Sequence, residues 1–468
     1  MIKNSFNNIE SRFTPFIKPM MILFSFIFVF GSIDTYRSLD STLKFNRLFI
    51  QGFGHPHFFS LFEIVFIFLL FLIVMEFGIK WESSSNISRL LFFMVVLTFA
   101  LKMLNPNNEP DNPILGMPLF SDISNYTFIL LAGFSLFLDD KVYIVFIKKL
   151  FYYVGIILSL RVFYLFLLWL MGKGNYYFGA NSTTNESDTL YIIAFFQIAF
   201  FALYLINKEK KYLILWLVFL LFQIFSYRRS ALAVALSANV LSYFFILLKE
   251  KGLRSKLVLI AGIILIYIGI NNIESINLPD KYERYILRFI SAIPGMATGE
   301  TGEFTDSGHW EQTTKTFYSA FRGLGFWGEG YGKSYNIYLE GQSTVIHNVY
   351  AATWAQHGIY MLIFYLLIIT IILYHLLRSF LFEEIVNQNY YILKISLCSF
   401  LLMWFAVLIT NPLIQLETIK MQVFWFTLFT IIIRISQNNA ELLVINIKKR
   451  KYYEQKISSQ NFNSYPVL

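Results

Sequence analysis

Residues 358–377 read GIYMLIFYLLIITIILYHLL, and this stretch decides the class of fold. Its twenty residues include no aspartate, glutamate, lysine or arginine. An α-helix of this length extends about 30 Å, which matches the hydrocarbon core of a lipid bilayer. We therefore interpret residues 358–377 as a helix that crosses a membrane.

The composition of the whole chain indicates a protein whose solvent is lipid. Of 468 residues, 56% are hydrophobic, 19% are aromatic and 14% are charged, whereas soluble proteins carry about 25% charged residues. Such a chain cannot bury its apolar surface in one or two soluble cores. Soluble enzymes, nucleic-acid-binding proteins and secreted disulfide scaffolds are therefore excluded. The single cysteine, Cys398, also excludes an intramolecular disulfide.

Apolar runs recur along the whole chain, so we expect a single integral membrane domain over residues 1–468. The predicted fold class is an all-α polytopic membrane protein with about 12 transmembrane helices. No small-residue cleavage site follows the first run, which predicts that it is retained. The predicted spans are residues 20–33, 58–78, 90–104, 117–138, 151–171, 188–206, 212–226, 231–248, 257–272, 358–377, 390–410 and 418–435.

The distribution of lysine and arginine orients these spans. With the N-terminus inside, the cytoplasmic segments hold 21 lysines and arginines, and the short outside loops hold 6. Because these residues collect on the cytoplasmic side, the asymmetry predicts that both termini are cytoplasmic. The basic tail at residues 448–451 is then a contact with membrane lipid, and no nucleic acid is expected as a partner.

Residues 273–346 are predicted to form one large helical periplasmic loop between spans nine and ten. This loop has 74 residues, of which nine are acidic and six are basic. Apolar residues recur at helical spacing after Asp280, and a second helix is expected to begin at Asp306 or Ser307. A glycine-rich turn follows, with the sequence Gly323-Leu-Gly-Phe-Trp-Gly-Glu-Gly-Tyr-Gly332. The pattern predicts a structured loop rather than a simple linker.

Arg228 and Arg229 lie in Ser226-Tyr-Arg-Arg-Ser-Ala231, the tight outside turn between spans seven and eight. Two arginines on the outer side oppose the general charge bias. Charged residues near the membrane core cost about 2.5–3.5 kcal/mol on insertion scales and usually mark function. Adjacent guanidinium groups suit phosphate oxygens because they present planar forks of N–H donors. The alternative interpretation is that both side chains reach lipid headgroups.

Two further basic residues lie inside predicted spans. Arg161 is near the middle of span five, where it could pair with Glu63 or extend the same anion site. The sequence leaves these two possibilities open. Lys394 lies closer to the cytoplasmic end of its span, so we expect its ammonium group to snorkel to water.

Histidines and a tryptophan supply further candidates. His347 opens the segment His347-Asn-Val-Tyr-Ala-Ala-Thr-Trp-Ala-Gln-His-Gly358 at the mouth of span ten. A histidine there can act as a base near neutral pH, although a lone histidine at a helix start is often an interface residue. His309 and Trp310 begin the second loop helix, and Arg322 follows its end. This cluster could contact sugars, but a solvated helix start explains it equally well.

Three motifs and their order along the chain resemble those of the bacterial O-antigen polymerase and O-antigen ligase superfamily, most closely the Wzy-type polymerases. The motifs are Ser-Tyr-Arg-Arg-Ser-Ala, the loop ending in Gly-Glu-Gly-Tyr-Gly, and His-Asn-Val-Tyr with Gly-Ile-Tyr-Met-Leu-Ile-Phe beyond it. The matching residues span about 225–365. The resemblance implies an inner-membrane glycosyltransferase with its active site on the periplasmic side, acting on undecaprenyl diphosphate-linked oligosaccharides.

The resemblance also implies roles for particular residues. His347 would be the catalytic base, and arginines would stabilise the diphosphate leaving group, so that no metal and no other cofactor is needed. Candidates for the diphosphate site are Arg228, Arg229, Arg322, Arg288 and Arg161. Candidates for sugar or loop contacts are His309, Trp310, Asn348 and Tyr350.

Two other functions remain open. An O-antigen ligase would use similar residues to deliver the polymer to lipid A-core. A flippase of lipid-linked oligosaccharides also has many spans, but its essential charges would be midplane ones such as Glu63 and Arg161. The unusual residues of this sequence gather instead at the outer face and in one large loop. For a polymerase, a chain-length regulator is a further candidate partner.

Overall fold

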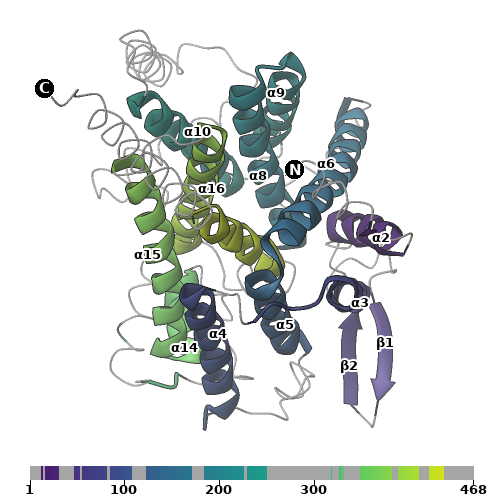
Figure 1. The fold of residues 1–468 in the computed structure, drawn as a ribbon, viewed down its shortest axis with the longest axis vertical. Coiled ribbons are helices and arrows are strands. Elements are labelled where there is room, and N and C mark those ends of the chain that lie inside the picture. The colour runs from purple at the N-terminus through teal and green to yellow at the C-terminus, as the bar shows by residue number, and fades with distance from the viewer. Residues whose placement is uncertain are drawn as a thin grey trace, which may run out of the picture.

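The structure is a computed structural model of the whole chain. It describes residues 12–13, 16–30, 47–52, 55–81, 85–107, 123–170, 184–225, 229–249, 318, 326–328, 330, 348–381, 388–410 and 421–436. This part of the chain is helical apart from one two-stranded hairpin (Figure 1). Predicted span nine and most of the loop 273–346 lie outside the described residues.

Helices occupy each of the other predicted spans. They are α2 (Ile17–Phe30), α3 (Leu61–Phe77), α4 (Asn86–Leu104), α5 (Ile123–Phe137), α6 (Asp140–Leu170), α8 (Thr184–Asn207), α9 (Lys210–Phe225), α10 (Arg229–Lys249), α15 (Ile359–Leu381), α16 (Gln388–Val407) and the C-terminal helix Met421–Ser436. A short helix, α14 (Val349–His357), precedes α15, and the 3₁₀ turn η5 (Leu408–Thr410) follows α16.

Within the described residues, five helices are long and apolar enough to cross a membrane. These five are Asn86–Leu104, Asp140–Tyr164, Leu190–Asn207, Ser230–Lys249 and Ile359–Leu381. The other apolar helices are shorter. The architecture is consistent with a helical membrane protein.

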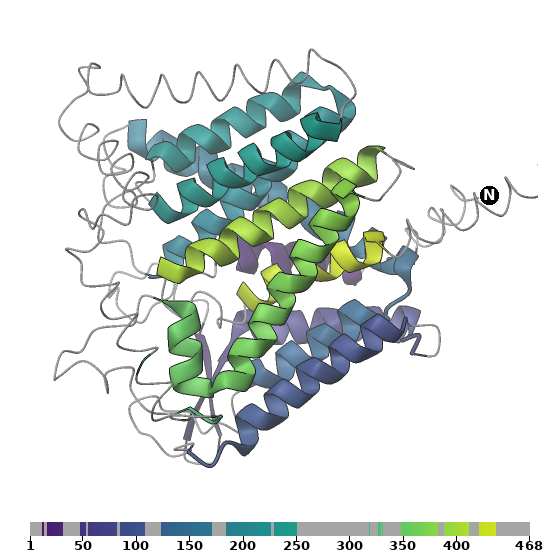
Figure 2. The ribbon, with the colours of Figure 1, turned by 90° about the vertical axis from the view of Figure 1, so that its left-hand side faces the viewer.

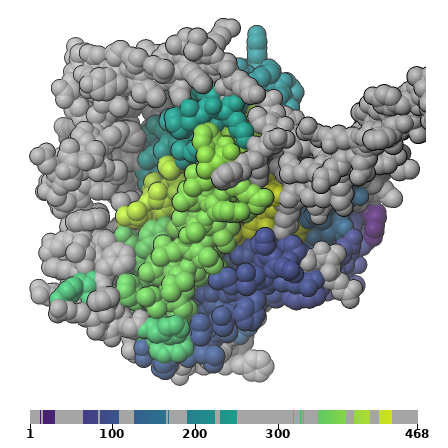
Figure 3. Space-filling view, turned by 60° about the vertical axis from the view of Figure 1, so that its left-hand side comes forward, coloured from purple at the N-terminus to yellow at the C-terminus, as the bar shows by residue number. Residues whose placement is uncertain are grey.

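Helix α15 has the two apolar faces that a lipid-facing helix requires. On one face Phe364 and Tyr365 are buried, at 3% and 1% exposure. On the other face Ile363 and Leu366 are about half exposed, although both are apolar. The helix lies along the surface beside α4 (Figure 3). Exposed apolar side chains at this density are unfavourable in water and favourable in lipid.

Helix α6 begins eleven residues before the predicted span and includes a segment expected to connect two spans. The Asp139 carboxylate starts it by accepting hydrogen bonds from the backbone N–H groups of Lys141 and Val142, at 2.9 and 3.5 Å. Val142 and Tyr143 in this extension are buried. Hydropathy alone missed the extension because Lys148 and Lys149 interrupt the apolar run.

Helices α8, α10 and α16 contact one another, and α15 also packs on α16. This packing overturns the expectation for Lys394, a residue of α16 that was predicted to snorkel. Its side chain is completely buried. Lys394 is buried because α8, α10 and α15 all pack against α16.

The helices run broadly side by side, so the bundle has two ends (Figure 2). We call one the α14 end, because the C-terminal end of α16 meets α14 there and the C-terminal end of α4 meets the turn at Trp327 that pairs with α14. We call the other the Arg434 end, where the C-terminus of α5 meets the N-terminus of α6. The hairpin of β1 (Arg47–Gly52) and β2 (His55–Ser60) is antiparallel, pairs Ile50 with His57, and leads into α3.

Candidate functional site

Three predicted site residues have described side chains, namely Arg161, Asn348 and Tyr350. Arg229 is the first residue of α10, but its side chain lies outside the described part. The other predicted site residues also lie outside it, and these are Arg228, Arg288, His309, Trp310, Arg322 and His347. The elements that directly adjoin these residues therefore define the geometry of the candidate site.

The start of α10, next to Arg229, is tied to α8 by a polar contact. The Tyr191 hydroxyl donates a hydrogen bond to Ser230 Oγ at 2.9 Å. Helix α9 joins the same region, because the Gln223 side-chain amide donates to the Leu190 carbonyl at 3.3 Å. Tyr191 is completely buried. The arginine motif therefore leads into a helix whose first turn is tied to α8, and α8 is in turn tied to α9.

Helix α14, which follows His347 and Asn348, is fixed at its start. Asn348 is 2% exposed and is the N-cap, since its Oδ1 accepts from the Ala351 N–H at 2.9 Å. A backbone N–H of the first turn that has no acceptor within the helix thereby gains a hydrogen bond. The Tyr350 hydroxyl donates to the Phe405 carbonyl of α16 at 2.7 Å. Burial raises the pKa of this hydroxyl, which keeps it protonated as a donor.

Both motifs are connected to the same end of α16, the second directly and the first through Tyr191 of α8. The Tyr191 ring lies 6.4 Å from the Trp404 ring, and Trp404 lies 5.2 Å from Phe405, measured between ring centroids. The Phe405 carbonyl is in turn the acceptor of Tyr350. A continuous set of contacts therefore runs from Ser230, beside Arg229, to the first turn of α14. Segments more than 100 residues apart in the sequence converge at the α14 end.

The glycine-rich turn at the end of the large loop reaches the same end. The Ile359 N–H donates to the Phe326 carbonyl at 3.1 Å, and the Gly330 N–H donates to the Gln356 carbonyl at 2.9 Å. Phe326 also packs against Tyr360 with ring centroids 5.4 Å apart. The turn therefore pairs with the chain on both sides of the junction between α14 and α15.

Asn105 and Asn107, just beyond α4, hold this turn, and the sequence analysis did not identify them. The Asn105 side chain donates to the Trp327 carbonyl at 2.6 Å, and Asn107 donates to the Gly328 carbonyl at 2.7 Å. The available signal was Asn-Pro-Asn directly after an apolar run, but a sequence cannot name the distant carbonyls that such amides bind.

Arg161 makes a contact with a neighbouring helix. Its side chain is 7% exposed and donates a hydrogen bond to the Val29 carbonyl, at the C-terminal end of α2. Because α6 begins at Asp140, Arg161 lies about two-thirds of the way along the helix rather than at its middle. The Glu63 side chain lies outside the described residues, so the pairing with Glu63 and the role at the diphosphate both stay predictions.

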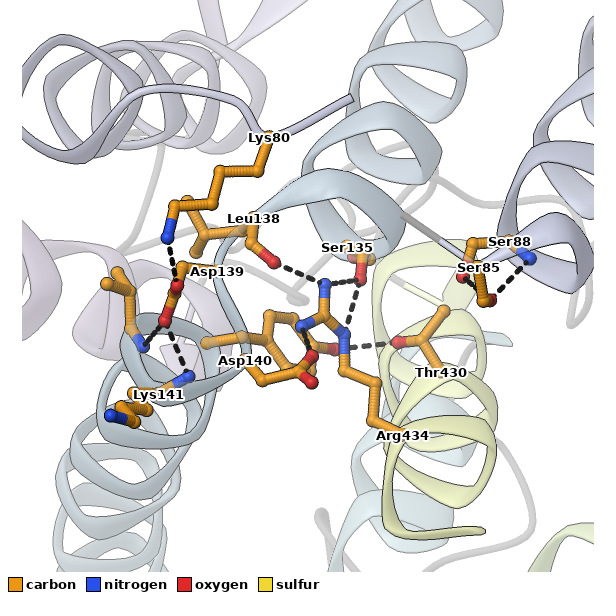
Figure 4. A network of polar contacts seen from close by, with 12 residues as sticks. Lys80, Ser85, Ser88, Ser135, Leu138, Asp139, Asp140, Lys141, Thr430 and Arg434 are labelled. Carbon is orange, nitrogen blue, oxygen red and sulfur yellow. Dashed lines mark hydrogen bonds and ion pairs between the residues drawn. The ribbon is translucent and has the colours of Figure 1, made fainter. Parts of the chain in front are cut away.

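The Arg434 end holds a polar network that the sequence analysis missed (Figure 4). Arg434 is 5% exposed, and its guanidinium donates to the Ser135 carbonyl at 2.6 and 2.9 Å and to the Leu138 carbonyl at 3.0 Å. It also pairs with the Asp140 carboxylate at 2.5 Å and lies 4.1 Å from the centroid of the Tyr143 ring. Arg434 thus caps the C-terminus of α5 and joins it to α6.

Asp139 completes this end of the bundle. Burial alone raises the pKa of its carboxyl. The Lys80 ammonium at 2.5 Å and the N–H groups of Lys141 and Val142 together lower this pKa by more than burial raises it, so the pKa is lowered overall. Every one of these groups has a partner within the protein. The arrangement fits a structural joint between α5, α6 and the C-terminal helix Met421–Ser436.

No protein-family model matches this chain, and no curated protein matches it. Within the described residues, no group of three or more His, Cys, Asp or Glu side chains lies close enough to hold a metal ion.

Proposed function

We propose that this protein is a membrane-embedded glycosyltransferase that polymerises undecaprenyl diphosphate-linked oligosaccharide repeat units into O-antigen or a related surface polysaccharide. The proposed reaction takes place at the periplasmic face of the bacterial inner membrane. The observation that carries the proposal is the convergence at the α14 end. Tyr350, three residues after His347, contacts the C-terminal end of α16 directly, and Ser230, next to Arg229, is connected to the same end through Tyr191 of α8.

The proposed chemistry needs a base and a cationic site close together. A hydroxyl of the acceptor sugar attacks the anomeric carbon of the growing chain, and His347 takes the proton that the hydroxyl loses. The new glycosidic C–O bond forms while the bond to the lipid diphosphate breaks. Undecaprenyl diphosphate leaves with the bonding electron pair, and the charge that it gains is stabilised by Arg228 and Arg229.

Support for an enzyme over a carrier comes from Arg161. This intramembrane charge donates to the carbonyl of Val29 and so contributes to the packing of α6 on α2. A carrier would be expected to keep such a charge for its substrate near the midplane. The polar contacts that connect distant motifs lie instead at the α14 end, which fits a reaction at one membrane face.

The test is a gel of surface polysaccharide from a strain that lacks this gene. The strain is complemented with the wild type, His347→Ala, Arg229→Ala, or Arg378→Ala as a matched control, with protein levels compared. Arg378 is exposed and donates to the Tyr374 hydroxyl within its own helix, so its loss should leave the ladder intact.

Three patterns separate the functions. Core with a single repeat unit in the deletion strain, unrestored by His347→Ala, supports the polymerase. Core without sugar, together with accumulated lipid-linked polymer, identifies a ligase. Full restoration by both His347→Ala and Arg229→Ala removes the proposed site, and the flippase then becomes the better explanation.

A further inference from the structure

The junction between α14 and α15 is closed by backbone pairing with the glycine-rich turn. Gly358 separates the two helices and has φ +98°, a conformation that favours glycine. The Phe326 carbonyl accepts from the residue after Gly358, and the Gln356 carbonyl before it accepts from Gly330. The large loop and α14 are therefore joined by main-chain hydrogen bonds, independently of side-chain identity.

Two glycines make this close approach possible. A Cβ on Gly358 would lie 2.1 Å from the Phe326 carbonyl oxygen. A Cβ on Gly328, which has φ +67°, would lie 2.6 Å from the Gly358 nitrogen and 2.8 Å from the Trp354 carbonyl oxygen. All of these obstructing atoms belong to the backbone. No side chain fits at either position unless the turn and α14 move apart.

Helix α4 anchors the turn from the other side. Asn107 and Asn105 donate to consecutive carbonyls of the turn, those of Gly328 and Trp327. The Asn107 backbone N–H donates to Asn105 Oδ1 at 2.9 Å, which orients the Asn105 side-chain amide. Asn105 is 5% exposed, so its hydrogen bond is shielded from water.

We propose that Asn105, Asn107, Gly328 and Gly358, together the glycine clamp, position α14 for the reaction at the α14 end. A helix of nine residues has little stability alone, so its orientation must come from tertiary contacts. Asn348 and Tyr350 fix its start, and the glycine clamp fixes its end. His347 directly precedes Asn348, the N-cap of this helix, so the clamp acts on the proposed base through α14.

The consequence for rate rests on the proposed function, whereas the consequence for local order does not. A misplacement of about 1 Å of a reacting group can cost roughly 100-fold in rate. The described contacts of the clamp residues are with the turn, with α14 and with one another. The clamp residues are therefore positioning residues, and their loss should lower kcat while leaving KM for the lipid-linked substrate unchanged.

The first measurement is hydrogen–deuterium exchange of the purified full-length protein in detergent. Gly328→Ala and Gly358→Ala should speed exchange at residues 349–357 and leave α10 unchanged. Gly78→Ala is the matched control, because Gly78 also has a positive φ (+73°) but its added Cβ would meet nothing within 4 Å. It should leave exchange in α14 at the wild-type rate.

Milder variants keep the test decisive if the alanine variants fold poorly. Asn105→Asp and Asn107→Asp keep the shape and the acceptor oxygen but remove the donor, so they should speed exchange in α14 to a smaller extent. If exchange at residues 349–357 matches the wild type in all four variants, the clamp is overturned whatever the activity shows.

The second measurement is turnover of lipid-linked repeat units extracted from the deletion strain. A fall of about 10- to 100-fold in kcat at constant KM, together with faster exchange in α14, supports the positioning role. Faster exchange with full turnover, while His347→Ala abolishes turnover, overturns that role. Full turnover in His347→Ala as well overturns the proposed function and with it the catalytic consequence of the clamp.

Discussion

The two ends of the bundle are held together by different chemistry. At the Arg434 end, one buried guanidinium binds two backbone carbonyls, a carboxylate and an aromatic face. At the α14 end, the joint is made by main-chain pairing, two glycines and neutral amides. At the Arg434 end, the guanidinium, the Asp140 carboxylate and the two carbonyls pair with one another. Within the described residues, the joint at the α14 end is built from backbone groups, glycines and neutral side chains.

The largest expected effect comes from removing the charge at the Arg434 end. Arg434→Met should destabilise the protein by roughly 3 kcal/mol, because hydrogen bonds to charged groups contribute about 1.5–3 kcal/mol each and buried carbonyls lose their donor. Thermal denaturation of the protein in detergent measures this change. Arg378→Met removes an exposed arginine and should change the midpoint little. Equal midpoints for the two variants would show that the network does not stabilise this end.

A smaller effect is expected from the N-cap at the α14 end. Asn348→Ala should cost about 1 kcal/mol because the first turn of α14 loses its side-chain acceptor. Asn348→Asp keeps the cap, so its stability should match the wild type in the same denaturation assay. If Asn348→Asp is stable but fails to make polymer, the amide group has a further role at the sugar, as the resemblance implies.

Two tyrosines allow a matched comparison between the ends. Tyr350→Phe removes the donor to the Phe405 carbonyl, and Tyr143→Phe removes the hydroxyl that lies 2.6 Å from Thr430 Oγ1. Each should cost about 1 kcal/mol, the typical net value of a hydrogen bond. Polymer length should fall only in Tyr350→Phe, because the Tyr350 bond helps to hold α14 and the Tyr143 bond does not contact it. An equal loss of polymer in both variants would contradict the difference between the ends.

The smallest expected effect concerns pH. Because the pKa of Asp139 is lowered in the folded protein, its contribution is present above the unfolded pKa and is lost as the pH falls through the folded one. The Lys80 and Asp139 side chains are 54% and 26% exposed, so this contribution should be at most about 1 kcal/mol. In Asp139→Asn the acid-dependent part of the melting curve should shrink. An unchanged acid dependence would exclude Asp139 as its source.

The described helices coincide with predicted spans because long apolar runs specify helices in lipid almost without regard to context. The errors arose where context decides. Lys148 and Lys149 hid the first turns of α6, which Asp139 begins, and Lys394 is buried because other helices surround α16. Neither outcome can be derived from the hydropathy of the segment alone.

The candidate site was predictable in part for a similar reason. Its glycine-rich turn has a local sequence pattern, so the turn was predicted from the sequence. The partners of the turn have no such local pattern, because Asn105 and the Trp327 carbonyl that it binds are 222 residues apart. Arg434 was missed because its partners, the last carbonyls of α5, are backbone atoms that any sequence would supply.

The most direct test of the central claim uses the purified protein in liposomes with undecaprenyl diphosphate-linked repeat units as the only sugar source. We predict that the wild type lengthens the oligosaccharide by whole repeat units and releases undecaprenyl diphosphate. His347→Ala should do neither, while Arg378→Ala should do both. Movement of the substrate between leaflets with no lengthening by the wild type would contradict the claim and identify a carrier.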